Sequence, residues 1–290
     1  MTTSLTAAAP RAEDQAEVDR LDQVLAGPGV PAKADVFKAV VRGDSVVALV
    51  ACGLAADLEE PTLAELSVVA GAGLDFAAVP GSVLDDAVAA AAEQGATRVV
   101  TTDDADAANV ADWLASNSFE RIGETVTWRR AAGATVPDPT PTRFQFRPFE
   151  PGEQTADALV GLASATFATA IFSAGERLVA RQDTVRQAVF GGTVGRVHVA
   201  IDGWPAVGWS VLSEPADGRA DLVLTYVQPG YEGQGVPGGL VALAAGWAED
   251  NGLELRTTVD PQREAELSET LPHFGFREES RIGIWQRAVS

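Results

Sequence analysis

Residues 226–243, YVQPGYEGQGVPGGLVAL, place a glycine-rich stretch between the end of an apolar run and the start of a helical apolar pattern. The first N–H groups of a helix have no partner within the helix and carry partial positive charge. Glycines let such a backbone turn sharply and approach a bound anion closely. The stretch therefore predicts a phosphate-binding loop, and its expected donors are the backbone N–H groups of Gly233, Gln234, Gly235, Val236 and Gly238.

Side chains that exchange protons stand close to this loop in the sequence. Tyr226 and Tyr231 flank it and are the only two tyrosines of the chain. His198 lies in the apolar segment RVHVAID, whose alternation turns it away from Val197 and Val199, toward a cleft or toward solvent. Each of these side chains also has an ordinary structural role, because strand tyrosines and histidines commonly pack in the core.

The elements that must position these residues follow from the hydrophobic periodicity of residues 142–287. Strands are expected at 142–150, 196–202, 205–212, 220–227, 253–259 and 277–287. Helices are expected at 155–171, 178–190, 235–252 and 263–275, the last ended early by Pro272. In the third helix the expected buried stripe is Leu240, Leu243, Ala244, Trp247 and Ala248, with Gly252 as the C-terminal cap.

The chain repeats itself at a shift of 157 residues, since Val79-Pro80-Gly81 falls on Val236-Pro237-Gly238 and Trp128 falls on Trp285. A Pro-, Ala- and Thr-rich seam, residues 131–141, separates the copies. We therefore expect two domains, 1–132 and 142–290, each of mixed α/β class with a central sheet flanked by helices.

The second copy resembles the GNAT superfamily of acyl-CoA-dependent N-acyltransferases. Its central strand ends in Val227-Gln228-Pro229, the segment 232–237 stands where that family has Arg/Gln-x-x-Gly-x-Gly/Ala, and Phe274-Gly275-Phe276 precedes the last strand. Two positions depart from the family motif, because Glu232 replaces Arg or Gln and Pro237 replaces Gly or Ala.

The resemblance implies acetyl-CoA or another acyl-CoA as co-substrate, and a small amine as acceptor. The backbone N–H of Val227 would polarise the thioester carbonyl and, with the loop, would bind the cofactor. The family's acid, a tyrosine in the short helix, is replaced by Leu271, and the preceding Asn by Glu264. Tyr226, Tyr231 and His198 remain as catalytic candidates, and Glu232 would bind the amine or, alternatively, cap the helix itself.

The first copy has a weaker loop, with Leu74, Asp75 and Phe76 where small residues are expected. It is therefore interpreted as a degenerate domain that packs against the second. This paired layout resembles that of mycothiol synthases, in which the C-terminal copy is active.

Composition narrows the range of partners. The formal net charge of −20 disfavours nucleic acid and anionic lipid as partners. Transfer of an aminoacyl group from tRNA, which needs a nucleic-acid substrate, is therefore disfavoured as a function. The single cysteine, Cys52, excludes an internal disulfide and makes a thiolate metal site unexpected. Without a leader-like or membrane-spanning segment, an acidic cytoplasmic protein is expected, as a monomer or homodimer, with no metal cofactor.

Two hypotheses remain after this narrowing: an N-acyltransferase whose second domain is active, and a catalytically degenerate binding or accessory protein on the same fold. The transferase hypothesis requires the amides of residues 233–238 to converge on a vacant hollow. If Glu232 or a neighbouring segment fills that hollow, only the tandem architecture remains supported.

Overall fold

The computed structural model describes residues 5–8, 36–42, 45–54, 63–70, 74–103, 109–137, 142–149, 194–203 and 206–289. The two helices expected at 155–171 and 178–190 lie outside the described residues. Within the described part of the chain, no helix is long and apolar enough to cross a membrane.

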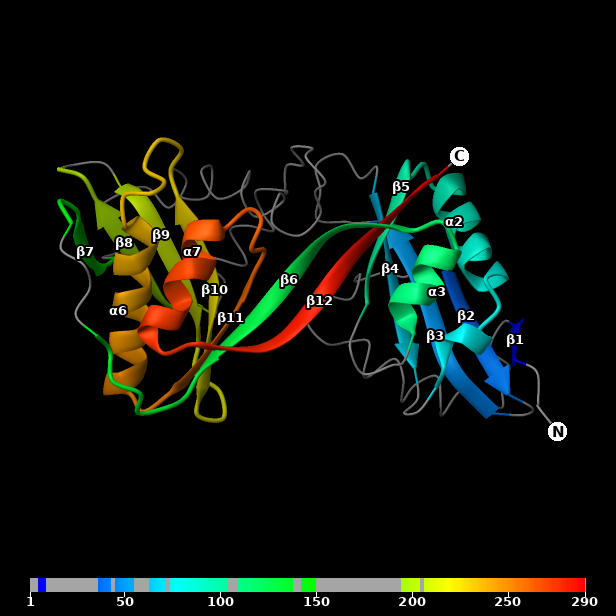
Figure 1. The fold of residues 1–290 in the computed structure, drawn as a ribbon, viewed down its shortest axis with the longest axis horizontal. Coiled ribbons are helices and arrows are strands. Elements are labelled where there is room, and N and C mark those ends of the chain that lie inside the picture. The colour runs from blue at the N-terminus through cyan, green and yellow to red at the C-terminus, as the bar shows by residue number, and fades with distance from the viewer. Residues whose placement is uncertain are drawn as a thin grey trace. The chain divides into compact units, whose positions relative to one another are not determined.

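The chain divides into two compact units, each a mixed sheet with helices packed on it (Figure 1). Unit 1 comprises Met1–Gly123 and Ile282–Ser290, and unit 2 comprises Glu124–Arg281. The mixed α/β class expected from the sequence is confirmed. The predicted boundaries, 1–132 and 142–290, divide the chain by its repeat and not by its packing, and they stay a prediction.

Unit 1 has the strand order β1-β2-β3-β4-β5-β12. Its strands are β1 (Leu5–Ala8), β2 (Val36–Arg42), β3 (Ser45–Leu54), β4 (Leu63–Ala70), β5 (Arg98–Asp103) and the second half of β12 (Arg277–Ala288). Its helices are η2 (Phe76–Ala78), α2 (Ser82–Glu93) and α3 (Val110–Ser116). Cys52 is buried in the core between this sheet and α2, as its apolar surroundings in the sequence indicate.

Unit 2 has the strand order β6-β11-β10-β9-β8-β7. Its strands are β6 (Glu120–Arg130, of which the part from Glu124 belongs to this unit), β7 (Gln145–Pro148), β8 (Val194–Ile201), β9 (Ala206–Ser213), β10 (Arg219–Val227) and β11 (Glu254–Val259). Its helices are α6 (Val236–Asp250), α7 (Ala265–Thr270) and η3 (Leu271–Phe274). The expected hairpin is the antiparallel pair β8–β9, and α7 ends before Pro272 as expected.

Helix α6 is buried along most of its length because it lies on β8, β9 and β10. Leu240, Ala244 and Ala248 are buried as expected, while Leu243 and Trp247 are only half-buried. The helix ends at Asp250, and Gly252 just beyond it has a φ of +66°, the left-handed conformation that commonly terminates a helix.

The last strand of each sequence repeat belongs to the other unit. β6 continues the first repeat but pairs with β11 of unit 2, and Trp128 packs against that unit's core. β12 continues the second repeat but pairs with β5 of unit 1, where Trp285 joins the core. Each of these two equivalent tryptophans therefore packs in or against the core of the unit formed mainly by the other repeat.

The repeated tripeptide differs in conformation between the two units. Val79-Pro80-Gly81 precedes α2, whereas Val236-Pro237-Gly238 forms the first turn of α6. The 157-residue shift still holds here, because α2 ends at Glu93 and α6 at Asp250, so α6 is simply three residues longer at its start.

Candidate functional site

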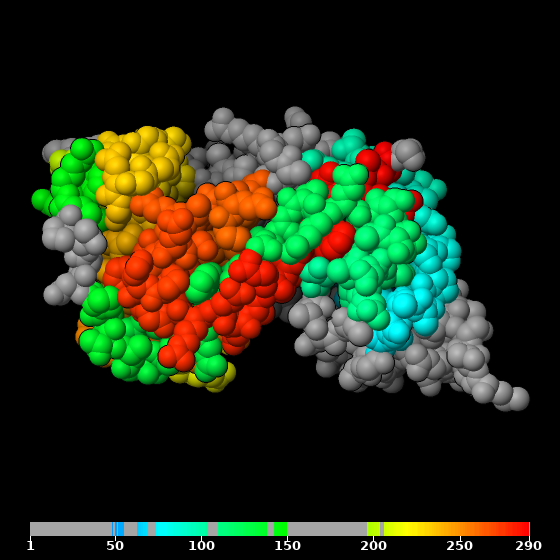
Figure 2. All heavy atoms as spheres, in the orientation of Figure 1, coloured from blue at the N-terminus to red at the C-terminus, as the bar shows by residue number. Residues whose placement is uncertain are grey.

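The glycine-rich loop joins the end of β10 to the start of α6. Gly230, Gly233 and Gly235 have φ of +93°, +70° and +82°, which side-chain-bearing residues adopt only with strain. At Gly235 an added Cβ would also lie 3.1 Å from Thr142 Cγ2. These glycines are thus required by the turn itself, which leaves Gly233 and Gln234 exposed. In Figure 2 the yellow part of the chain, which includes the loop, lies at the surface next to the orange part, which includes α7.

β10 and β11 separate as they approach this loop. Their parallel pairing runs only from Arg219 to Asp221 of β10, although β10 continues to Val227 and β11 to Val259. The next residue, Gln228, donates its N–H to Val207 O of β9 at 2.8 Å. Donors alternate in direction along a strand, so the N–H of Val227 points away from β9, into the opening between β10 and β11.

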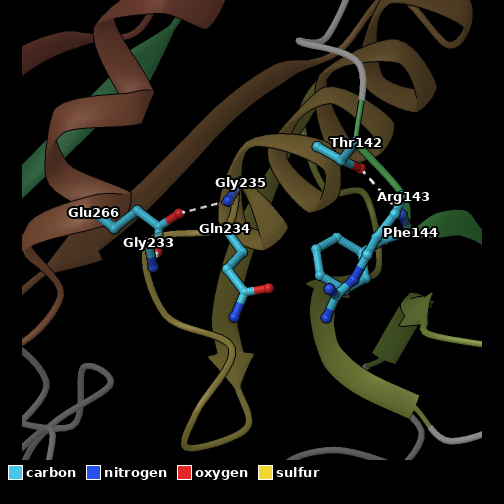
Figure 3. Close-up of a pocket in the computed structure, with 7 residues that line it drawn as sticks. All are labelled: Thr142, Arg143, Phe144, Gly233, Gln234, Gly235 and Glu266. Carbon is cyan, nitrogen blue, oxygen red and sulfur yellow. Dashed lines mark hydrogen bonds between the residues drawn. The ribbon is translucent and has the colours of Figure 1, made fainter.

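A hollow of about 580 Å³ lies at the loop. It is lined by residues from three segments, namely Thr142, Arg143, Phe144, Gly233, Gln234, Gly235 and Glu266 (Figure 3). A space of this size holds a diphosphate with part of the attached molecule. Of the predicted donors, Gly233, Gln234 and Gly235 line it.

Two of those donors are already engaged by a carboxylate of the protein. Glu266, in the first turn of α7, accepts the N–H of Gly233 at 2.7 Å and that of Gly235 at 3.0 Å (Figure 3). Glu232 is turned back on the loop instead, and it accepts the N–H of Gly230 at 2.6 Å. The expectation of a vacant hollow is therefore met only in part: the space exists and Glu232 does not fill it, but a neighbouring helix takes two of its amides.

This geometry has two consequences for an anionic ligand. The amides of Gly233 and Gly235 bind an oxyanion, as their bonds to Glu266 demonstrate. A diphosphate must displace that carboxylate to reach them, and the nearby Glu232 adds to the repulsion that it meets. The loop can therefore bind an anion, and in this conformation the anion that it binds is the carboxylate of Glu266.

Arg143 places one positive charge at the same hollow. Its Nη2 lies 3.0 Å from Asp202 Oδ2, and its guanidinium carbon lies 5.0 Å from the centre of the Phe144 ring. Phe144 in turn makes an edge contact with Tyr231, with ring centres 6.0 Å apart. Neither Arg143 nor Glu266 is predictable as a site residue from the sequence, because nothing local in the sequence links them to the loop.

The two tyrosines lie on different sides of the sheet. Val227 packs with Val236 beneath α6, so strand alternation puts Tyr226 on the opposite face. There Tyr226 is buried against Trp209, with ring centres 6.3 Å apart. Only Tyr231 accompanies the loop, half-buried beside Phe144.

His198 lies on the face of the sheet that α6 covers, in line with Ser210 of β9 and Thr225 of β10. Its side chain is 1% exposed, so it faces neither solvent nor the hollow at the loop. Burial, reinforced by the charge of Arg196, lowers the pKa of His198 to about 4. Among the described residues, His198 Nδ1, Ser210 Oγ and Thr225 Oγ1 are buried and have no hydrogen-bond partner.

The two positions that depart from the family in the short helix have distinct environments. Leu271 is fully buried in the core of unit 2. Glu264 lies beyond the end of β11 and accepts the N–H of Asp260 at 3.1 Å. Burial, with a smaller contribution from the charge of Asp260, raises the pKa of Glu264 to about 7.

The corresponding turn of unit 1 is filled by aromatic side chains. Phe76 of η2 is buried against Trp113 of α3, with ring centres 4.9 Å apart. Trp113 Nε1 donates to Val79 O at 3.0 Å, and Asp75 caps η2 by accepting the N–H of Ala77. Across the described residues of both units, no group of three His, Cys, Asp or Glu side chains is placed to hold a metal ion.

Solved structures share this fold over the whole chain. A GCN5-related N-acetyltransferase from Sphaerobacter thermophilus has a TM-score of 0.69 at 15% identity, covering 98% of this chain and 96% of that one. A tandem GNAT protein from the clavulanic acid biosynthesis pathway has a TM-score of 0.58 at 15% identity, with 99% of both chains covered. The glucosamine N-acetyltransferase region of a fungal GH3 β-N-acetylglucosaminidase has a TM-score of 0.66 at 13% identity, covering 99% of this chain and 38% of that one.

No protein-family model matches the chain, and no curated protein matches it by sequence. The structural likeness therefore establishes the fold. The chain has the GNAT fold in a tandem arrangement, as the sequence motifs predicted.

Proposed function

We propose that the protein is an acyl-CoA-dependent N-acyltransferase, acting on a small amine at its C-terminal unit. The observation that carries this proposal is the opening between β10 and β11, into which the Val227 N–H points beside a glycine loop. A mere strand-to-helix connection would not require the strands to separate. Acetyl-CoA is the simplest donor, and the acidic surface suits a cationic acceptor better than a nucleic acid.

The transfer forms one bond and breaks another. The unprotonated amine nitrogen attacks the thioester carbonyl carbon, the carbon–sulfur bond breaks, and the amine loses a proton while the thiolate takes one. Bound acyl-CoA supplies the activated carbonyl. The Val227 N–H donates a hydrogen bond to the carbonyl oxygen, where negative charge develops, and such donors lower the barrier by several kcal/mol.

The remaining roles are assigned by position. The N–H groups of Gly233 and Gly235 hold the diphosphate after Glu266 has left them. Glu232, exposed at the loop, attracts the ammonium form of the acceptor. Tyr231, which lies in the loop beside Phe144, donates the proton to the thiolate, and the buried Tyr226 and His198 shape the sheet beneath it.

Calorimetric titration with acetyl-CoA, propionyl-CoA and CoA tests the proposal, followed by thiol release in the presence of a panel of small amines. Binding with amine-dependent thiol release is the expected result. No binding of any of the three ligands, at protein concentrations that detect millimolar affinity, would contradict it.

A second candidate function is a binding or accessory protein that transfers no acyl group, and the position of Glu266 favours it. Under that function, the carboxylate is a permanent replacement for the diphosphate. The variant Glu266→Ala then distinguishes the two, because a retired site gains CoA binding without gaining amine-dependent thiol release.

A further inference from the structure

A positively charged side chain, Arg143, lines the hollow at the loop, although the loop motif itself lacks one. Glu232 occupies the position at which the resemblance leads one to expect an arginine or glutamine, and it contributes negative charge there. Arg143, more than eighty residues earlier in the chain, lines the same hollow as Gly233 and Gly235. The geometry therefore brings a guanidinium to the loop from a different element.

Arg143 is positioned so that it can reach a ligand. Its side chain is 62% exposed, and its ion pair with Asp202, itself 31% exposed, is of the solvent-screened kind that exchanges at little cost. Its guanidinium lies over the Phe144 ring, at the wall of the hollow (Figure 3). The amides of Gly233 and Gly235, which already hold a carboxylate, show that an oxyanion binds at the same wall.

We infer that Arg143 binds a phosphate group of the ligand and replaces the missing cation of the loop motif. The inference rests on the proposed function, because it assigns the residue that recognises the phosphates of an acyl-CoA. A guanidinium suits this role, since its planar donors match two phosphate oxygens at once. When a ligand displaces Asp202 from Arg143 and Glu266 from the loop, it gains the Arg143 guanidinium and the N–H groups of Gly233 and Gly235 as donors.

The experiment compares the wild type with Arg143→Ala, using CoA, 3′-dephospho-CoA and inorganic diphosphate as probes in calorimetry at low and high salt. Loss of one charge-assisted contact weakens binding about tenfold, and the loss shrinks as salt rises. If Arg143 binds the 3′-phosphate, the variant loses affinity for CoA alone. If it binds the diphosphate, affinity for all three probes falls together.

The matched control is Arg219→Ala, which removes an exposed arginine, ion-paired to Asp221 at 3.7 Å, from the start of β10 in the same unit. Each variant is also made in combination with Glu266→Ala, which frees the two loop amides and so brings weak ligand binding within the range that calorimetry detects. Arg143→Lys keeps the charge without the fork, and an intermediate affinity is expected for it.

Three results separate this inference from the proposed function. CoA binding that Arg143→Ala leaves unchanged overturns the inference and leaves the function standing. Arg143-dependent binding of diphosphate without binding of CoA supports the inference and overturns the function. Binding of none of the probes, by the wild type or by Glu266→Ala, overturns both.

Discussion

Removing the Glu266 carboxylate should strengthen CoA binding, because it frees two amides of the loop. The carboxylate accepts bonds of 2.7 Å and 3.0 Å from Gly233 and Gly235. Bonds to a charged group are worth about 1.5–3 kcal/mol each when buried, and about 1 kcal/mol each at donors as exposed as these. A ligand that must displace Glu266 therefore forgoes about 2 kcal/mol, which corresponds to about 30-fold in affinity.

The assay is calorimetric titration of CoA into the wild type and Glu266→Ala, with thermal melting of both. The variant should bind about 30-fold more tightly and melt about 5 °C lower, since the same two bonds stabilise the unliganded protein. Glu269→Ala is the control, because Glu269 is an exposed carboxylate on the same helix. Equal CoA affinities for Glu266→Ala and the wild type would refute the reasoning.

Three further variants test the loop and the sheet beneath it. Glu232→Arg exchanges the bond to the Gly230 N–H for a cation, so CoA affinity should rise about tenfold at low salt; a rise that salt does not reduce would argue against it. Burial lowers the pKa of His198 to about 4, so as pH falls below 6.5 the unfolded chain binds a proton before the folded protein does, and the free energy of unfolding should drop by about 2 kcal/mol between pH 7 and 4.5. Urea unfolding at pH 7 and 4.5 should show a smaller drop for His198→Gln, and equal drops would count against this assignment. Gly235→Ala, at φ +82°, should lower the melting temperature by several degrees, whereas Gly246→Ala, at a helix position with open space, should raise it.

Much of this architecture follows from local patterns. The run 220–227, the glycines after it and the apolar face of α6 predicted a strand, a turn and a helix in that order, and all three are present. The turn follows because only glycine adopts the positive φ of residues 230, 233 and 235 without strain.

What the sequence did not reveal depends on distant contacts. Glu266 reaches Gly235 from 31 positions further along the chain, and an acidic residue in a short helix is ordinarily solvated. The exchange of β6 and β12 was hidden as well, because a repeat fixes the order of strands in each copy and not the copy with which they pair. The repeated Val-Pro-Gly did not reveal that the two helices begin at different points, since identical residues stand before α2 and inside α6.

The most direct test of the central claim is an amide NMR titration of ¹⁵N-labelled protein with acetyl-CoA. The proposal predicts that the N–H signals of Gly233, Gly235 and Val227 shift together in a saturable way, because the loop and the strand opening hold one ligand. Acetyl-CoA that leaves all three signals unmoved at millimolar concentration, or that moves only signals of unit 1, would contradict it.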